Sequence, residues 1–256
     1  QLSIVHFQLS IERMEHFFNY SRRKSSVVHI GNTPLGGDNP IRIQSMANVS
    51  TMDTDAAVRQ AIRMIEAGAE YVRFTAQGER EARNLGVIRK QLNEAGYTTP
   101  LVADIHFNPR AADAAAEEVE KVRINPGNYV DKVKTFDLLE YTDEEYAAEL
   151  QKIRDRFVPF LNICKAHGTA IRIGVNHGSL SDRIMSRYGD TPEGMVASCM
   201  EFLRICRDEN FSDVVISIKA SNTVVMVKTV RLLVRTMEAE DMHYPLHLGV
   251  TEAGDG

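Results

Sequence analysis

The sequence is poor in cysteine, and its three cysteines form no familiar metal-binding pattern. Cys164, Cys199 and Cys206 include no C-x-x-C pair. Cys199 and Cys206 are seven residues apart in a helix-like stretch, which places both on one helix face. Packing in the core is therefore the preferred interpretation over metal ligation. Three reduced thiols are typical of a reducing compartment, so we expect a bacterial cytoplasm or a plastid stroma.

Several other signatures are absent from the sequence. It contains no G-x-x-x-x-G-K-[ST], G-x-G-x-x-G or H-E-x-x-H string, so no motif supports a nucleotide cofactor or zinc. The net charge of -5 gives no support to a nucleic-acid partner, which favours a basic face. No apolar run approaches the roughly 18 residues of a membrane span. The first residues also lack the basic and apolar regions of a secretory signal.

What the sequence does contain is a regular alternation of short strands and amphipathic helices. Residues 1–24 show no clear period and are interpreted as an appended arm, and the Gly- and Pro-rich residues 27–40 as a small β-hairpin. Thr142 with Glu145 predicts a capping box at the start of a helical stretch. Pro159, further along that stretch, predicts that it divides into two helical pieces. The seven strand candidates are residues 41–46, 71–76, 100–105, 121–126, 169–175, 213–220 and 245–253.

This alternation favours parallel βαβ units. A length of 256 residues suits one (β/α) barrel, which takes about 250 residues. A barrel is preferred to an open sheet because polar residues follow every strand rather than only those at one switch point. We therefore predict an α/β fold, a TIM-type barrel over residues 25–256, whose eighth strand and helix would lie downstream in a longer polypeptide.

Polar side chains share one face at the C-terminal end of each predicted strand. Buried charges need partners or a ligand, and arginines with a lysine at the mouth of a barrel would bind an anion such as phosphate. Ser179 to Asp182 reads as a helix start. The residues at the strand ends are Gln44, Arg73, Thr75, Asp104, His106, Arg123, Asn125, Arg172, Asn176, Ser217, Lys219, Ser221, His247 and Glu252.

Each of these assignments has a purely structural alternative. The arginines could pair with Asp104 and Glu252, although the four cations at the strand ends outnumber these two acids. His106 could be structural, a phosphate donor or a proton carrier, and the glycines near Asn125 and Asn176 allow simple turns. Glu252 could transfer protons or form an ion pair with Lys219 or Arg172.

The ordered strings RIQSM, VRFT, LVADIHF, VRINPGN, IRIGVNHGSLSDRI, SIKASN and LHLGVTEAG resemble the N-terminal barrel of the 4-hydroxy-3-methylbut-2-enyl diphosphate synthase family. The resemblance covers residues 25–254. The string NHGSLSDRIMSRYGDTPEGMV is similar to the three-domain form of plants and some bacteria, which has an inserted domain before its iron-sulfur domain. By this resemblance, we expect both of those domains to lie outside this chain.

The resemblance implies an oxidoreductase of the methylerythritol phosphate route to isoprenoids. Its substrate would be 2-C-methyl-D-erythritol 2,4-cyclodiphosphate, opened reductively with loss of water by two electrons that ferredoxin or flavodoxin delivers through a [4Fe-4S] cluster. By the same resemblance, Asn125 and Asn176 would support the site, and Glu252 with Asp104 would be catalytic. The residues that would hold the diphosphate are Arg73, His106, Arg123, Arg172 and Lys219.

The family's cluster is held by three Cys and one Glu of a domain that this chain lacks. Cys164, Cys199 and Cys206 do not match those ligands, so we expect no metal or cluster on this chain and no activity from it alone. The resemblance implies a homodimer for the intact protein. Two alternatives are a phosphate-binding barrel of the dihydropteroate-synthase type, which would act without iron, and a non-catalytic assembly module.

Overall fold

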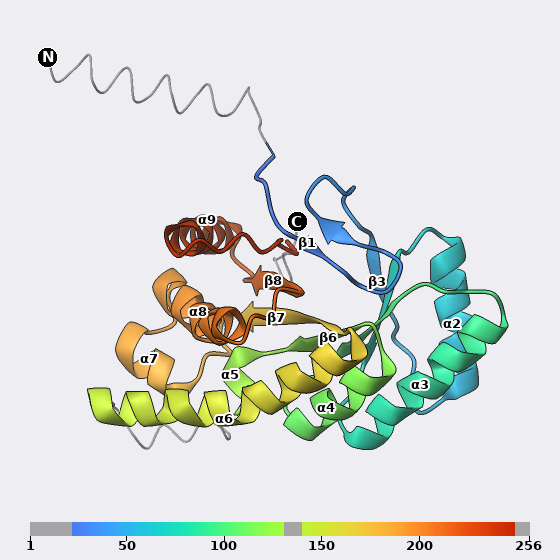
Figure 1. Ribbon diagram of the computed structural model, residues 1–256, viewed down its shortest axis with the longest axis horizontal. Coiled ribbons are helices and arrows are strands. Elements are labelled where there is room, and N and C mark those ends of the chain that lie inside the picture. Colours follow the sequence, from blue (N-terminus) through green and yellow to red (C-terminus); the bar gives the residue numbers. More distant parts are fainter. Residues whose placement is uncertain (1–21, 131–139, 249–256) are drawn as a thin grey trace, which may run out of the picture.

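The computed structural model describes residues 22–130 and 140–248 of the chain. Most of the predicted arm, the end of the last strand candidate and Glu252 lie outside these residues. A curled parallel sheet forms the centre of the described part (Figure 1). Its strands run in sequence order, and they are β3 (Gln44–Met46), β4 (Tyr71–Thr75), β5 (Leu101–Asp104), β6 (Lys121–Ile124), β7 (Ala170–Asn176) and β8 (Val214–Lys219).

The predicted α/β barrel architecture is confirmed as a half barrel of six strands in the described residues. All five neighbouring pairs are parallel. The seventh strand candidate is present as a single parallel bridge between Ile216 and Leu246. The two edges of the sheet are thus β3 and the segment of Leu246.

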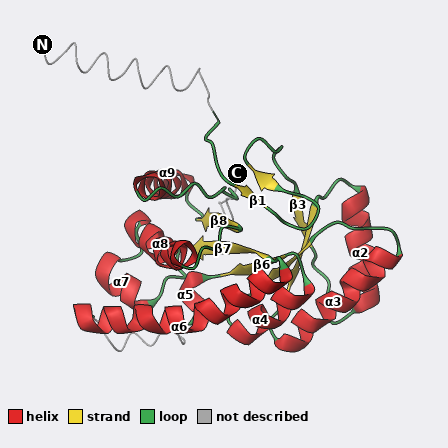
Figure 2. Ribbon diagram, viewed as in Figure 1, coloured by secondary structure: helices red, strands yellow, loops and turns green. Residues whose placement is uncertain are grey.

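Helices cover the outer face of the curled sheet (Figure 2). None of those in the described residues combines the length and hydrophobicity that crossing a membrane requires. The helices are α2 (Thr54–Glu66), α3 (Glu79–Glu94), α4 (Pro109–Glu118), α5 (Pro126–Tyr129), α6 (Asp143–His167), α7 (Asp182–Tyr188), α8 (Pro192–Asp208) and α9 (Thr223–Ala239).

Helix α6 begins as predicted but does not divide at Pro159. Thr142 and Glu145 form the expected capping box, and one helix of 25 residues contains Pro159 in its interior. An internal proline costs about 3 kcal/mol. Ile153, Phe157, Phe160 and Leu161 on both sides of it are buried, and each contributes roughly 1.5–3 kcal/mol. The prediction of two helical pieces was wrong because this burial outweighs the local cost.

The predicted hairpin is confirmed, and it closes the N-terminal end of the half barrel. β1 (Val27–Val28) pairs antiparallel with β2 (Leu35–Gly36). Gly36 of β2 has φ +87°, and a Cβ there would lie 2.2 Å from the Ser26 carbonyl oxygen, so this position in the hairpin requires glycine. We call the apolar layer under the hairpin the floor; it comprises Val28, Ile30, Tyr71, Val102, Ala170 and Val215.

Successive residues of a strand point to opposite faces, so the residues two positions beyond the floor also point inward. These are Arg73, Asp104, Arg172 and Ser217. Arg123 lies beside Asp104 and Arg172 in the register, and we call Arg73, Asp104, Arg123 and Arg172 the arginine layer. The mouth, where the strands end, lies one layer further on.

Candidate functional site

The arginine layer shares one carboxylate. Asp104 is fully buried and pairs with Arg73, and its Oδ1 lies 3.2 Å from Nη1 of Arg123. Arg123 also donates from Nη2 to the carbonyl oxygen of Gly174 at 3.1 Å. A Cβ at Gly174 would lie 2.5 Å from Nε of Arg123. Glycine at this position therefore leaves room for the guanidinium.

Arg172 is the arginine of this layer without a carboxylate partner in the described part of the chain. Its side chain is 1% exposed, and its Nη1 lies 3.3 Å from Nε2 of His247. Nε of Arg73, Arg123 and Arg172 has no hydrogen-bond acceptor among the described residues. The salt-bridge alternative is thus correct for Asp104, but buried donors remain unsatisfied, and an anion would satisfy them.

The positive charge inside the half barrel is strong enough to move proton equilibria. Burial, followed by the charges of Arg73 and Arg123, lowers the pKa of Arg172 to about 9. Burial, followed by the charges of Arg172, Arg73 and Arg123, lowers the pKa of Lys219, a half-buried side chain at the mouth, to about 8. Burial opposes the ionisation of Asp104, but Arg123 and Arg73 outweigh it and hold its pKa below the usual value. Asp104 is therefore an anion near neutral pH.

Two histidines contact this charged layer, and both are kept neutral. His106 Nε2 lies 3.6 Å from Oδ2 of Asp104, and burial lowers its pKa more than Asp104 raises it. Burial and then Arg172 lower the pKa of His247 to about 3. A neutral His247 can accept the hydrogen bond that Arg172 donates. The sequence placed His247 at a strand end without assigning it this partner.

Asn125 directly follows β6, and Asn176 is the last residue of β7. Asn125 Oδ1 accepts from the backbone N–H of Gly127 at 3.2 Å, which makes Asn125 the N-cap of α5. This confirms the turn interpretation for Asn125. Asn176 lies beside Lys219 in the register, and its buried Oδ1 has no partner in the described residues. Asn176 therefore keeps an unused acceptor beside a cation.

Lys121 is a further interior basic side chain that the sequence reasoning missed. Its side chain is 1% exposed, and its Nζ lies 4.2 Å from the centre of the Tyr71 ring. Burial, Arg172 and Arg73 lower its pKa well below the usual value. The alternation of side chains along a strand could have predicted that Lys121 points inward, since Lys121 is two residues before Arg123 and on the same face.

The cysteines confirm the core-packing interpretation. Cys164, Cys199 and Cys206 are buried, and burial raises the pKa of each thiol. Within residues 22–130 and 140–248, no three His, Cys, Asp or Glu side chains gather as metal ligands would. The described residues therefore do not fit an iron-sulfur cluster, because such a cluster needs several cysteine thiolates close together in space.

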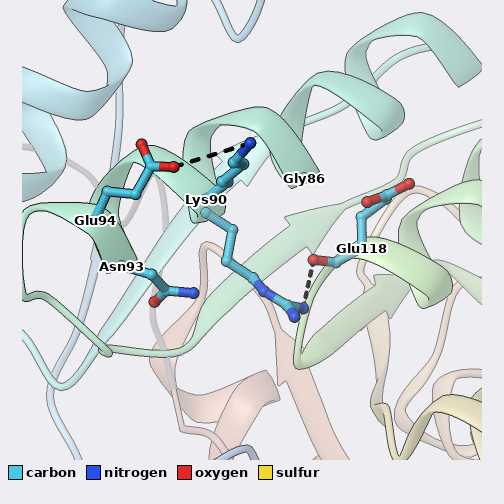
Figure 3. Close-up of a pocket in the computed structure, with 6 residues that line it drawn as sticks. Gly86, Lys90, Asn93, Glu94 and Glu118 are labelled. Atoms are coloured by element: carbon cyan, nitrogen blue, oxygen red, sulfur yellow. Dashed lines mark hydrogen bonds and ion pairs between the residues drawn. The ribbon is translucent and has the colours of Figure 1, made fainter.

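Two surface depressions are present in the described part. A groove of about 470 Å³ on α3 and α4 is lined by side chains that satisfy one another (Figure 3): Arg89 donates to the Glu118 carbonyl oxygen at 2.8 Å, and Lys90 pairs with Glu94 at 3.9 Å. A cleft of about 480 Å³ is lined by Gln44 of β3 and by His247. Its lining also includes Leu35 and Gly36 of the hairpin, so the cleft lies between the two edges of the half barrel on the side of the hairpin.

Comparisons with known proteins place these residues in a family. The model of the GcpE TIM-barrel domain matches residues 25–256. A Parabacteroides distasonis protein named 4-hydroxy-3-methylbut-2-en-1-yl diphosphate synthase (flavodoxin) is 91% identical over 240 residues, which cover 94% of this chain and 39% of that protein. A Porphyromonas gingivalis protein of the same name is 63% identical over 95% of this chain and 42% of its own length. The chain thus spans about two fifths of these relatives.

Solved structures agree on the fold. A truncated 3-deoxy-D-arabino-heptulosonate 7-phosphate synthase from Thermotoga maritima superposes with a TM-score of 0.52 at 14% identity, covering 88% of this chain and 69% of that one. An N-acetylneuraminic acid synthetase from Leptospira borgpetersenii gives the same TM-score at 13% identity, covering 89% of this chain and 71% of that one. At such identities the likeness concerns the fold alone.

Proposed function

Because the chain belongs to the GcpE TIM-barrel domain family, we propose that it is the substrate-binding barrel of a 4-hydroxy-3-methylbut-2-enyl diphosphate synthase. The enzyme would convert 2-C-methyl-D-erythritol 2,4-cyclodiphosphate by reductive ring opening with loss of water. The observation that carries the proposal is the charge imbalance inside the half barrel. Arg73, Arg123, Arg172 and Lys219 face one carboxylate, Asp104, in the described residues.

A cyclic diphosphate suits this imbalance because its phosphoryl oxygens accept hydrogen bonds and carry negative charge. Arg172 and Arg123 would bind these oxygens through guanidinium N–H groups that now lack acceptors. Lys219 would add a point charge at the mouth. His106 would hydrogen-bond the same anion, with Asn125 and Asn176 supporting the mouth.

Asp104 and Glu252 remain the proposed catalytic residues. Asp104 orients Arg73 and Arg123 through its ion pairs, which supports a role in placing the anion. Glu252 lies outside the described residues and stays a prediction as the group that transfers protons at the hydroxyl-bearing carbon.

The reducing step needs a partner domain. The described residues do not fit a [4Fe-4S] cluster, so we propose that the cluster, with its supply of two electrons, is held by a domain of the longer protein that the relatives represent. The names of those relatives mention flavodoxin, which favours flavodoxin over ferredoxin as donor. We further propose a homodimer and, since these relatives are bacterial, a cytoplasmic location.

Binding of the cyclodiphosphate to the chain, followed by calorimetry, tests this proposal. We expect 1:1 binding that Arg172→Met or Arg123→Met abolishes. Arg204→Met is the matched control, because Arg204 pairs with Glu240 on the outer surface. Unchanged binding in the two interior variants would refute the site. The family match favours this function over the dihydropteroate-synthase alternative, and a mouth that binds no anion would favour the assembly module.

A further inference from the structure

The start of α5 and the loop after β7 are locked together at the mouth in a way that the proposed function does not yet use. Residues 125–128 follow β6 and residues 176–179 follow β7; we call their contact the clasp. A Cβ at Gly127 would lie 1.7 Å from the carbonyl oxygen of Ser179. Such proximity fixes the position of Ser179 relative to Asn125.

The side-chain hydroxyl of Ser179 accepts two hydrogen bonds in the clasp. Asn125 Nδ2 donates to its Oγ at 2.9 Å, and Asn128 Nδ2 donates at 3.1 Å. A serine hydroxyl has two acceptor lone pairs and one proton to donate. Both lone pairs are therefore occupied, and no acceptor for the proton is present in the described part of the chain.

The direction of the hydrogen bond from Asn125 is fixed by a second contact of the same amide. Asn125 Oδ1 accepts from the backbone N–H of Gly127 at 3.2 Å, so its amide nitrogen must be the group that faces Ser179. Ser179 cannot reverse the bond and donate to Asn125. Its proton must go elsewhere, to water or to a ligand.

The place of Ser179 favours the ligand. Its backbone N–H donates to the carbonyl oxygen of Asn176 at 3.1 Å, and Asn176 lies beside Lys219 in the register. Asn125 comes two residues after Arg123 on the inward face of β6. Ser179 is half-buried, so it stands beside the ends of β6 and β7, at the edge of the mouth.

We propose that Ser179 is a further substrate-binding residue, whose hydroxyl donates a hydrogen bond to a phosphoryl oxygen of the anion that the arginine layer holds. The inference rests on the proposed function, because it needs an anion in the mouth. The clasp amides hold the hydroxyl in the donating orientation before the anion arrives, so little rotational freedom is lost on binding.

Inorganic pyrophosphate, titrated calorimetrically into the full chain, is the probe that tests this role. Ser179→Ala removes the proton donor together with two clasp hydrogen bonds, whereas Asn128→Ala removes one clasp hydrogen bond and leaves the hydroxyl. We expect Ser179→Ala to weaken pyrophosphate binding about tenfold, as loss of a hydrogen bond to a charged group does, and Asn128→Ala to weaken it less than about threefold.

Thermal unfolding without pyrophosphate separates binding from loop stability. We expect both variants to lower the midpoint by a few degrees, since both weaken the clasp. Equal losses of affinity in the two variants, or wild-type affinity in Ser179→Ala, would overturn the role of Ser179 while leaving the proposed function intact if Arg172→Met abolishes binding. If the wild-type chain binds no pyrophosphate, both proposals fall.

Discussion

Replacing Arg172 by methionine should abolish anion binding and at the same time stabilise the empty protein. Burial and the charges of Arg73 and Arg123 lower the pKa of Arg172 from its usual value to about 9, and one pKa unit corresponds to about 1.4 kcal/mol. The fold thus penalises the charged side chain by roughly 5 kcal/mol before any relaxation. Exchanging buried charges for apolar groups of similar volume gains about 1–4 kcal/mol where measured. We expect a gain within that range, or a rise of the melting midpoint by about 2–4 °C for each kcal/mol.

Arg123→Met is the matched comparison, because it removes a similar side chain from the same layer. Arg123 is an ion-pair partner of Asp104, so its loss leaves a buried carboxylate with one arginine fewer. Breaking a buried pair costs about 3–5 kcal/mol. Urea denaturation at pH 7 in phosphate-free buffer should therefore order the stabilities as Arg172→Met, wild type, Arg123→Met. If Arg172→Met destabilises as strongly as Arg123→Met, the reasoning from charge imbalance is refuted.

Three other predictions concern different links between sequence and function. Pyrophosphate affinity should fall above pH 8, by at most about tenfold per pH unit for each group, because Lys219 has a pKa of about 8 in the empty protein and binding requires its charged form. In Lys219→Met the decline should begin only near pH 9, where Arg172 loses its proton, which calorimetry across pH 7–9.5 checks. Gly174→Ala should weaken anion binding because its Cβ would displace the Arg123 guanidinium, 2.5 Å away at Nε, and normal affinity would contradict this. Pro159→Ala should stabilise the fold by up to about 3 kcal/mol in urea denaturation, and a loss of stability would show that the proline ring itself packs well.

The sequence predicted the elements that depend on local patterns. Short apolar runs bounded by Gly and Pro became strands, and the capping box at Thr142 formed because its hydrogen bonds lie within four residues. The helix break at Pro159 failed because the burial of Phe157 and Phe160 comes from distant elements. Local propensity is overridden when tertiary packing supplies more free energy.

The site was predictable as a set of residues but not as a set of contacts. Strand alternation was enough to place Arg73, Asp104, Arg123 and Arg172 on one face. It could not pair Arg172 with His247, which is 75 residues away, because that contact depends on how the sheet curls. The contact of Asn125 with Ser179 depends likewise on two loops that meet only in the folded chain.

The hairpin that covers the floor also constrains the order in which the molecule can fold during synthesis. Ser26 Oγ donates to the carbonyl oxygen of His243, 217 residues later, and the His29 backbone N–H donates to Asp213. At a synthesis rate of about 5–20 residues per second, the hairpin must wait roughly 10–40 s for these partners to be translated. Until then Val28 and Ile30 have no complete surface to cover, so the hairpin docks only after β8 and the segment of His243 have been made, and chaperones that bind nascent apolar segments have that interval in which to act.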